Sequence, residues 1–161
     1  MKWIRWFLVV FMVVATDGMY GQISGADSTF EAHRVKFDPS KNPASDLQAA
    51  VITATKEKKR IILDVGGEWC SWCHRLDRFL HDQEDLDAYL SQHYVVVKVN
   101  FSKENKNETF LGQYPAIDGY PHMFVLESDG KFLHSQSTGD FESGKGYDHD
   151  KVMKFLKKWS L

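Results

Sequence analysis

The chain contains two cysteines, Cys70 and Cys73, which are separated by two residues and followed at once by His74. Three kinds of chemistry use this spacing: a small structural disulfide, attachment of a haem or a metal ion, and reversible thiol–disulfide exchange. A structural disulfide here would close a four-residue loop, to which the chain-entropy relation assigns about 2 kcal/mol, against about 4.7 kcal/mol for a 100-residue loop. This small gain argues against a purely structural role.

The stretch Cys70-Ser-Trp-Cys73-His74 also matches the C-x-x-C-H pattern by which c-type haem is attached. This motif directly follows an apolar strand pattern within an apparent α/β domain. A haem would instead need an apolar pocket and usually a distal ligand. Zinc usually takes four protein ligands. His74 could join the two sulfurs, but His81 lies about 10 Å from His74 along the predicted helix, too far to bind the same ion. Covalent haem binding therefore stays as an alternative, and we predict no metal site.

For reversible exchange, a position at a strand-to-helix turn is favourable. Cys70 would lie at the N-terminus of a helix, where free backbone N–H groups and the helix dipole stabilise a thiolate. Lowering the pKa of a thiol from ~8.5 to ~7 raises its thiolate fraction at pH 7 from about 3% to about 50%, although its intrinsic nucleophilicity falls. The larger benefit is that Cys70 becomes a better leaving group when Cys73 attacks a mixed disulfide. The pattern favours a redox-active pair.

The elements around the cysteines alternate between helical and strand patterns. Before residue 115 we expect, in order, a helix at 44–58 with Ser45 as its N-cap, a strand at 61–65, a helix from residue 71, a helical stretch at 85–92, a strand at 94–101 and a short helix at 108–114. After it we expect a strand at 122–126, a turn at 129–130, a returning strand at 131–136, a loop at 139–149 and a closing helix at 152–159. This order predicts an α/β fold whose mixed sheet is parallel in its first half and antiparallel in its C-terminal hairpin, with helices on both faces.

The composition agrees with one folded domain. The chain has 161 residues, of which 43% are hydrophobic, so it can bury a substantial core. Its 20 basic residues are balanced by 22 acidic ones, which argues against binding to nucleic acid.

The N-terminal stretch has the order of a secretory signal peptide: Lys2 and Arg5, an apolar run at 6–15, then small and polar residues. We expect a signal peptide at 1–21, with cleavage between 18 and 26, an extension at 22–43 and the folded domain at 44–161. Ten apolar residues are too few for the ~20 that cross a bilayer, so no stable membrane insertion is expected. The mature protein would be periplasmic or secreted.

Three stretches of the sequence resemble the thioredoxin family. They are IILDVGGEWCSWCHRL, similar to the strand–WCxxC–helix element of the family, VVVKVNF, similar to its next parallel strand, and DGYPHMFVLESDGK, similar to its cis-proline loop and hairpin. The resemblance covers about residues 44–160. The helical pattern HDQEDLDAYLSQHY is similar to the reducing C-terminal domains of bacterial thiol–disulfide interchange proteins.

The resemblance implies roles for five residues of a catalytic centre. Cys70 would be the attacking thiolate and Cys73 the resolving thiol. Asp64 would accept the proton of Cys73, since burial in an apolar strand favours the protonated form of a carboxyl and so helps it to exchange protons near working pH. Lys98 would pair with Asp64, although an exposed position for this lysine is the alternative. Pro121 would follow a cis peptide bond.

The substrate would be held by residues around this centre. Trp69 and Trp72 would form an apolar rim, and Tyr120 with Pro121 would leave backbone free to pair with an extended substrate. His74 either tunes Cys70 through space or caps the helix, and the role of His122 is open. Because Trp72 stands where a histidine would favour an oxidant, Ser71-Trp72 is expected to set the redox direction.

The resulting expectation is a thiol–disulfide oxidoreductase that reduces protein disulfides outside the cytoplasm. Its only redox group would be the Cys70–Cys73 disulfide, with no cofactor, and its electrons would come from a membrane or soluble thiol donor. The alternatives are a c-type haem-binding protein and a thioredoxin-like interaction module without catalysis.

Overall fold

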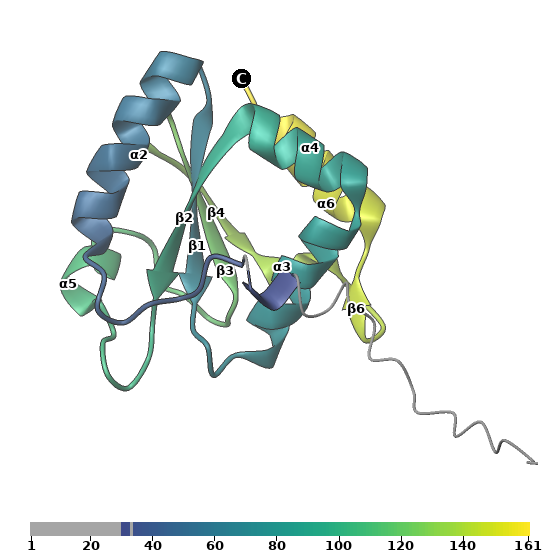
Figure 1. Cartoon of the computed structure of the whole chain (residues 1–161), viewed down its shortest axis with the longest axis horizontal. Coiled ribbons are helices and arrows are strands. Elements are labelled where there is room, and N and C mark those ends of the chain that lie inside the picture. Colours follow the sequence, from purple (N-terminus) through teal and green to yellow (C-terminus); the bar gives the residue numbers. More distant parts are fainter. Residues whose placement is uncertain (1–29, 33) are drawn as a thin grey trace, which may run out of the picture. The chain divides into compact units, whose positions relative to one another are not determined.

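The computed structural model describes residues 30–32 and 34–161 of the chain (Figure 1). The expected signal peptide, its cleavage site and the first part of the extension lie outside these described residues. The chain divides into two units, Met1–Ala32 and His33–Leu161. In the first unit, residues 30–32 form a helical turn, and everything that follows concerns the second.

Helix α2, Pro43–Glu57, begins one residue earlier than expected. Its N-cap is Asn42, whose side chain accepts hydrogen bonds from the backbone N–H groups of Ala44 and Ser45. The expectation that Ser45 is the N-cap is therefore wrong, because Ser45 lies inside the first turn. Asn42 is the better cap since Pro43, which has no N–H to satisfy, fits the first helical position.

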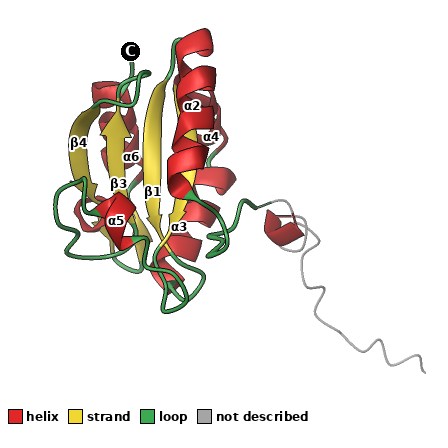
Figure 2. Ribbon diagram, turned by 90° about the vertical axis from the view of Figure 1, so that its left-hand side faces the viewer, coloured by secondary structure: helices red, strands yellow, loops and turns green. Residues whose placement is uncertain are grey.

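The central sheet has four strands: β1 Arg60–Gly66, β2 Tyr94–Asn100, β3 His122–Leu126 and β4 Phe132–Ser137. Their order across the sheet is β2-β1-β3-β4, in which β1 and β2 are parallel and the other two pairs antiparallel. Figure 2 shows the strands side by side. The expected mixed sheet is confirmed. In its register Asp64 of β1 lies between Lys98 of β2 and Met123 of β3.

Two helical layers cover the sheet, as expected (Figure 1). Helices α2 and α5 (Glu108–Leu111) pack on one face, where every second residue of β1 joins their core, namely Ile61, Leu63 and Val65. On the other face Ile62 packs with three further helices, α3 Ser71–Asp82, α4 Glu84–His93 and α6 His149–Trp159. Because β1 is buried from Ile61 to Gly66, Asp64 is carried into the interior on this second face.

The segment between β4 and α6 is more ordered than the expected loop at 139–149. It contains a 3-10 turn, Thr138–Phe141, and a two-stranded hairpin of β5 Glu142–Ser143 and β6 Gly146–Tyr147. Phe141 and Tyr147 are buried in the core beneath α3 and α6, which is why this segment is fixed. Helix α6 starts at His149, with Asp148 as N-cap, three residues earlier than expected.

Among residues 30–32 and 34–161, no helix is long and apolar enough to cross a membrane.

Candidate active site

Cys70 is the N-cap residue of α3, and it is joined to Cys73 by a disulfide bond. Its sulfur accepts a hydrogen bond from the backbone N–H of Cys73 at 3.1 Å. The same N–H also donates to the backbone carbonyl of Cys70 at 3.1 Å, so it is shared between the two acceptors. The bond to sulfur would stabilise a thiolate there. The exposed fractions are 5% for Cys70 and 1% for Cys73, so Cys73 is the deeper of the two.

The disulfide packs against the end of β1 and against residues 34–42, the segment before α2. Phe37 from that segment, 2% exposed, forms one buried cluster with the two cysteines. At Gly66, a Cβ atom would come within 2.5 Å of the Cys73 sulfur and 3.0 Å of Phe37. Only glycine lets the strand pass this close to the second sulfur.

Two buried carboxyl groups share one lysine. Lys98 Nζ lies 2.6 Å from Asp64 Oδ2 and also contacts Asp77 Oδ1. The side chains are 3% exposed for Asp64, 11% for Lys98 and 8% for Asp77. No described residue donates a hydrogen bond to Asp64 Oδ1. The structure thus brings Asp64 and Lys98 together, rather than leaving the lysine on an exposed side of the strand.

Asp77 is a member of this buried cluster that the sequence motifs did not predict. Burial raises the pKa of this carboxyl above its usual value, Lys98 opposes the rise, and the neighbouring Asp64 adds to it. For Lys98 burial acts to lower the pKa, but the two carboxylates outweigh it and the net pKa is raised, so the lysine stays charged. A signal was present, since Asp77 follows Cys73 by four residues and such pairs share a helix face.

A second cation reaches the site from outside the sheet. Arg34 contacts Glu68, at 2.5 and 3.1 Å, and Asp77, at 3.1 Å. Its hydrogen bond to Glu68 raises the pKa of the guanidinium further. Glu68 Oε1 also accepts the backbone N–H of Phe37 at 2.9 Å. No pattern in the sequence links Arg34 or Phe37 to the cysteine motif, so their place at the site could not be predicted.

Three aromatic rings form the outer wall of the site. Trp69, 59% exposed, donates its indole N–H to the carbonyl of Phe101 at 2.6 Å. It also meets Tyr120 edge to face, with centroids 5.7 Å apart, and Tyr120 stacks on Phe101 at 4.8 Å. The Tyr120–Pro121 peptide bond is cis.

Trp72 belongs to another side of the site. Its ring packs edge to face on Tyr147 of β6, 5.5 Å between centroids, and Arg75 lies over it. Trp72 and Tyr120 nevertheless both pack against the cluster of Phe37 and the cysteines. Of the two tryptophans expected to form the rim, Trp69 is exposed and contacts Tyr120, whereas Trp72 is partly buried against Tyr147 and the cysteine cluster.

The two histidines with open roles have separate surroundings. His74 Nε2 lies 2.9 Å from the backbone carbonyl of Glu68 and 3.8 Å from its carboxylate, so the ring holds the loop before Cys70. His122 is 5% exposed and lies 2.8 Å from the hydroxyl of Ser135. Burial lowers its pKa, which keeps the ring neutral as a component of the core.

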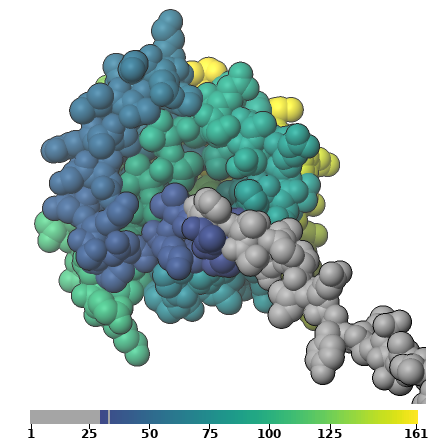
Figure 3. Space-filling model, in the orientation of Figure 1, coloured from purple at the N-terminus to yellow at the C-terminus, as the bar shows by residue number. Residues whose placement is uncertain are grey.

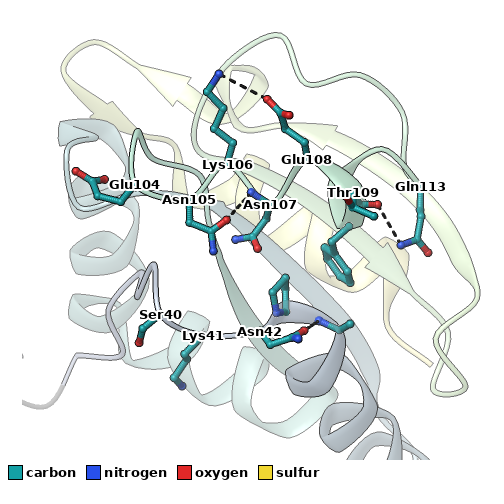
Figure 4. Close-up of a pocket in the computed structure, with 13 residues that line it drawn as sticks. Ser40, Lys41, Asn42, Glu104, Asn105, Lys106, Asn107, Glu108, Thr109 and Gln113 are labelled. Carbon is teal, nitrogen blue, oxygen red and sulfur yellow. Dashed lines mark hydrogen bonds and ion pairs between the residues drawn. The ribbon is translucent and has the colours of Figure 1, made fainter.

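A hollow of about 830 Å³ lies between the start of α2 and the segment 104–113 (Figure 4). Its lining includes none of the residues assigned to the redox centre, and the side chain of Asn42 is already used to cap α2. Among residues 30–32 and 34–161, no group of three or more His, Cys, Asp and Glu side chains could hold a metal ion.

A disulfide at a strand-to-helix turn, with a buried acid on that strand and a cis-proline directly before the neighbouring strand, defines a class of protein. Residues 42–128, more than half of the chain, match the model of a family described as thioredoxin-like. The chain belongs to the thioredoxin-like family.

One curated relative has a name from disulfide chemistry. The protein named disulfide bond reductase DsbH from Chlamydia pneumoniae is 27% identical over 101 residues, which cover 57% of this chain and 58% of that protein. The chain thus spans less than two thirds of the first curated relatives that it matches.

Two solved structures share the fold. A disulphide isomerase from Xylella fastidiosa Temecula1 superposes with a TM-score of 0.64 at 24% identity, over 78% of this chain and 97% of that one. The oxidised DsbD C-terminal domain of Neisseria meningitidis gives a TM-score of 0.51 at 21% identity, over 72% and 95%.

Proposed function

We propose that the protein is a thiol–disulfide oxidoreductase that reduces protein disulfides outside the cytoplasm. The observation that carries the proposal is the Cys70–Cys73 disulfide at the N-terminus of α3. The Cys73 sulfur packs against Gly66, and the buried Asp64 lies two residues earlier on the same strand. The family membership and the relative named a disulfide bond reductase support the same chemistry.

In the proposed reaction the reduced protein attacks first through Cys70. Its thiolate forms a bond to one substrate sulfur while the substrate S–S bond breaks, and the released substrate thiolate takes a proton from solvent. Cys73 then loses its proton to Asp64 and attacks Cys70, which releases the second substrate thiolate. The protein disulfide is re-formed, two electrons have passed to the substrate, and the proton on Asp64 returns to solvent or to the leaving thiolate.

The substrate we propose is an extended segment of another protein. Tyr120 and Pro121 would present backbone to it, while Trp69 and Trp72 would contact its apolar side chains. A groove of about 390 Å³ continues from Phe101 and Tyr120, lined mainly by the apolar part of segment 111–117, with Lys106 and Glu108 at its edge. Side chains that flank the substrate cysteine can enter this groove.

The reducing direction and the compartment rest on separate arguments. Trp72 cannot stabilise the Cys70 thiolate by charge, as a histidine there would, and the relative from Chlamydia pneumoniae is named a reductase. The pattern of the first 21 residues favours export, and a reductase in an oxidising compartment needs a thiol donor, membrane-bound or soluble.

A Cys73→Ser variant tests the proposal directly. Because Cys70 could still attack but not be displaced, mixed disulfides with substrate proteins should accumulate and run as extra bands on non-reducing gels. The matched control is Cys70→Ser, which retains Cys73 and should trap nothing.

The alternatives predict other outcomes. Absence of adducts together with absence of insulin reduction would indicate an interaction module. A coloured protein with a Soret band and covalent porphyrin would indicate haem attachment instead.

A further inference from the structure

The segment before α2 contributes side chains to the active site, although it precedes the matched region 42–128. Figure 3 shows this segment lying across the surface between α2 and the helices of the opposite face. Phe37 packs on the cysteines, and its ring lies 4.5 Å from Lys98 Nζ. Arg34 bridges Glu68 and Asp77.

The charges around Asp77 come from four parts of the chain. Asp64 and Lys98 face it from β1 and β2, and Arg34 faces it from the segment before α2. Glu68 shares that arginine, and His74 lies 3.8 Å from Glu68. Three carboxyl groups thus share two permanent cations, so the ionisation of each carboxyl depends on the others.

We propose that Arg34 is a positioning residue for thiol–disulfide exchange, which holds Asp77 ionised so that Lys98 is shared by two carboxylates and Asp64 remains able to take the proton of Cys73. The proposal rests on the function proposed above. Arg34 does not touch the reacting sulfurs in this arrangement, and it acts through Asp77 and Lys98.

The physical reason is competition for one ammonium group. The Asp77 side chain is only 8% exposed, and burial favours its protonated form. The charged hydrogen bond from Arg34 opposes this and keeps the negative charge beside Asp64. Without Arg34, the pKa of Asp77 would rise further, so Lys98 would pair more closely with Asp64, which would then be a poorer proton acceptor.

The test combines a titration and a rate. The titration follows the ¹³C signal of the Asp77 carboxyl by NMR in the oxidised protein, assigned with Asp77→Asn. The rate is that of disulfide reduction between pH 5.5 and 9.5. Both are measured for the natural protein, Arg34→Gln, Arg34→Lys, Glu68→Gln, and the matched control Lys36→Gln, which removes an exposed charge from the same segment.

We expect Asp77 to be ionised at pH 7 in the natural protein and its pKa to rise in Arg34→Gln. The rate of Arg34→Gln at pH 7 should fall about tenfold, the effect of one pKa unit. The loss should shrink toward pH 9.5, which lies above the ordinary pKa of a thiol, so that a base is needed less. Arg34→Lys should restore most of the rate, while Lys36→Gln should match the natural protein.

Two results would overturn the proposal. One is a protonated Asp77 at pH 7 in the natural protein, which can be measured even if Arg34→Gln does not fold. The other is an equal change in Glu68→Gln and Arg34→Gln, which would show that Arg34 only anchors the segment. Because the titration requires no turnover, an inactive protein would contradict the proposed function and leave the role of Arg34 to be decided by the carboxyl signal.

Discussion

At the scale of single residues, the two oxygens of the Asp64 carboxyl group differ in their hydrogen bonding. One oxygen is held by Lys98 at 2.6 Å, while the other receives no hydrogen bond from any described residue. A buried acceptor left open in this way is unfavourable for stability. In the proposed mechanism it is useful, since the open oxygen can accept a proton without first breaking a hydrogen bond.

Replacing Asp64 by Asn should slow the resolving step and leave the first attack intact. An amide cannot accept the proton of Cys73, so the decay of the mixed disulfide at pH 7 should slow by about a hundredfold, the lower end of the range for general base catalysis. Quenched-flow measurement of the adduct from pH 6 to pH 10 checks this. The deficit should shrink above pH ~8.5, where a free thiol ionises unaided.

Asp82→Asn is the matched control, because Asp82 is an exposed acid on the same helix as Cys73. In this variant the mixed disulfide should decay at the same rate as in the natural protein. An Asp64→Asn variant that resolves the adduct at the natural rate at pH 7 would show that the proton goes elsewhere.

At the scale of elements, the end of β1 sets how closely the sheet approaches α3. Gly66→Ala would place a Cβ 2.5 Å from the Cys73 sulfur, so either the cysteine or Phe37 must move. Overpacking of this kind costs about 1–3 kcal/mol in unfolding free energy, measurable by urea denaturation. Gly146→Ala meets no atom within 4 Å and should be nearly neutral. Equal stability of both variants would show that the site adapts freely.

The segment before α2 should also contribute to stability. Phe37 is 2% exposed, and Phe37→Ala should cost about 3 kcal/mol by loss of buried contacts around the disulfide. Val35→Ala, at a site 61% exposed, should change the unfolding free energy by no more than about 0.5 kcal/mol. A Phe37→Ala protein as stable as the natural one would mean that this segment only rests on the surface.

Helices α4 and α6 are linked by a contact that depends on pH. His149 lies beside Asp150 and Asp85, whose hydrogen bonds raise its pKa above 6.5. The charged form is favoured in the folded state, so this stabilisation is complete below pH ~6.5 and disappears as the pH rises through the raised pKa. His149→Gln should therefore lower the Tm at pH 5.5 and not at pH 9. An equal loss at both pH values would assign the effect to packing.

Local patterns predicted the elements well where burial alone determines them. The strands at β1, β2 and β3 and the turn of α3 after Gly66-Gly67 follow from apolar runs and glycines. The cap of α2 was misplaced because Asn42 and Ser45 are both good N-caps, and only the adjacent proline distinguishes them. The β5–β6 hairpin was missed since two-residue strands have no periodicity.

At the scale of the whole molecule, the site depends on groups brought together from distant parts of the chain. Cys70, Cys73, Asp64 and Pro121 could be predicted because the motifs that contain them are local. The contact between Arg34 and Glu68 could not, since Arg34 lies outside the stretches that carry the resemblance and is placed only by the course of the chain before α2. Tertiary ion pairs of this kind leave no periodic trace in a single sequence.

The mixed sheet with helices on both faces also explains why chemistry is confined to one end. The carboxyl ends of β1 and β2 and the start of β3 meet there. The disulfide therefore follows β1, Lys98 lies on β2, and the Tyr120–Pro121 bond directly precedes β3. The core on each face of the sheet holds this end in place.

The reduction potential of the Cys70–Cys73 couple tests the central claim most directly. It is obtained by equilibrating the purified full-length protein with dithiothreitol or glutathione buffers and quantifying free thiols at each ratio. We predict a value near that of a thioredoxin-type reductant, about −270 mV. A value near −120 mV, typical of a strong oxidant, would contradict the account.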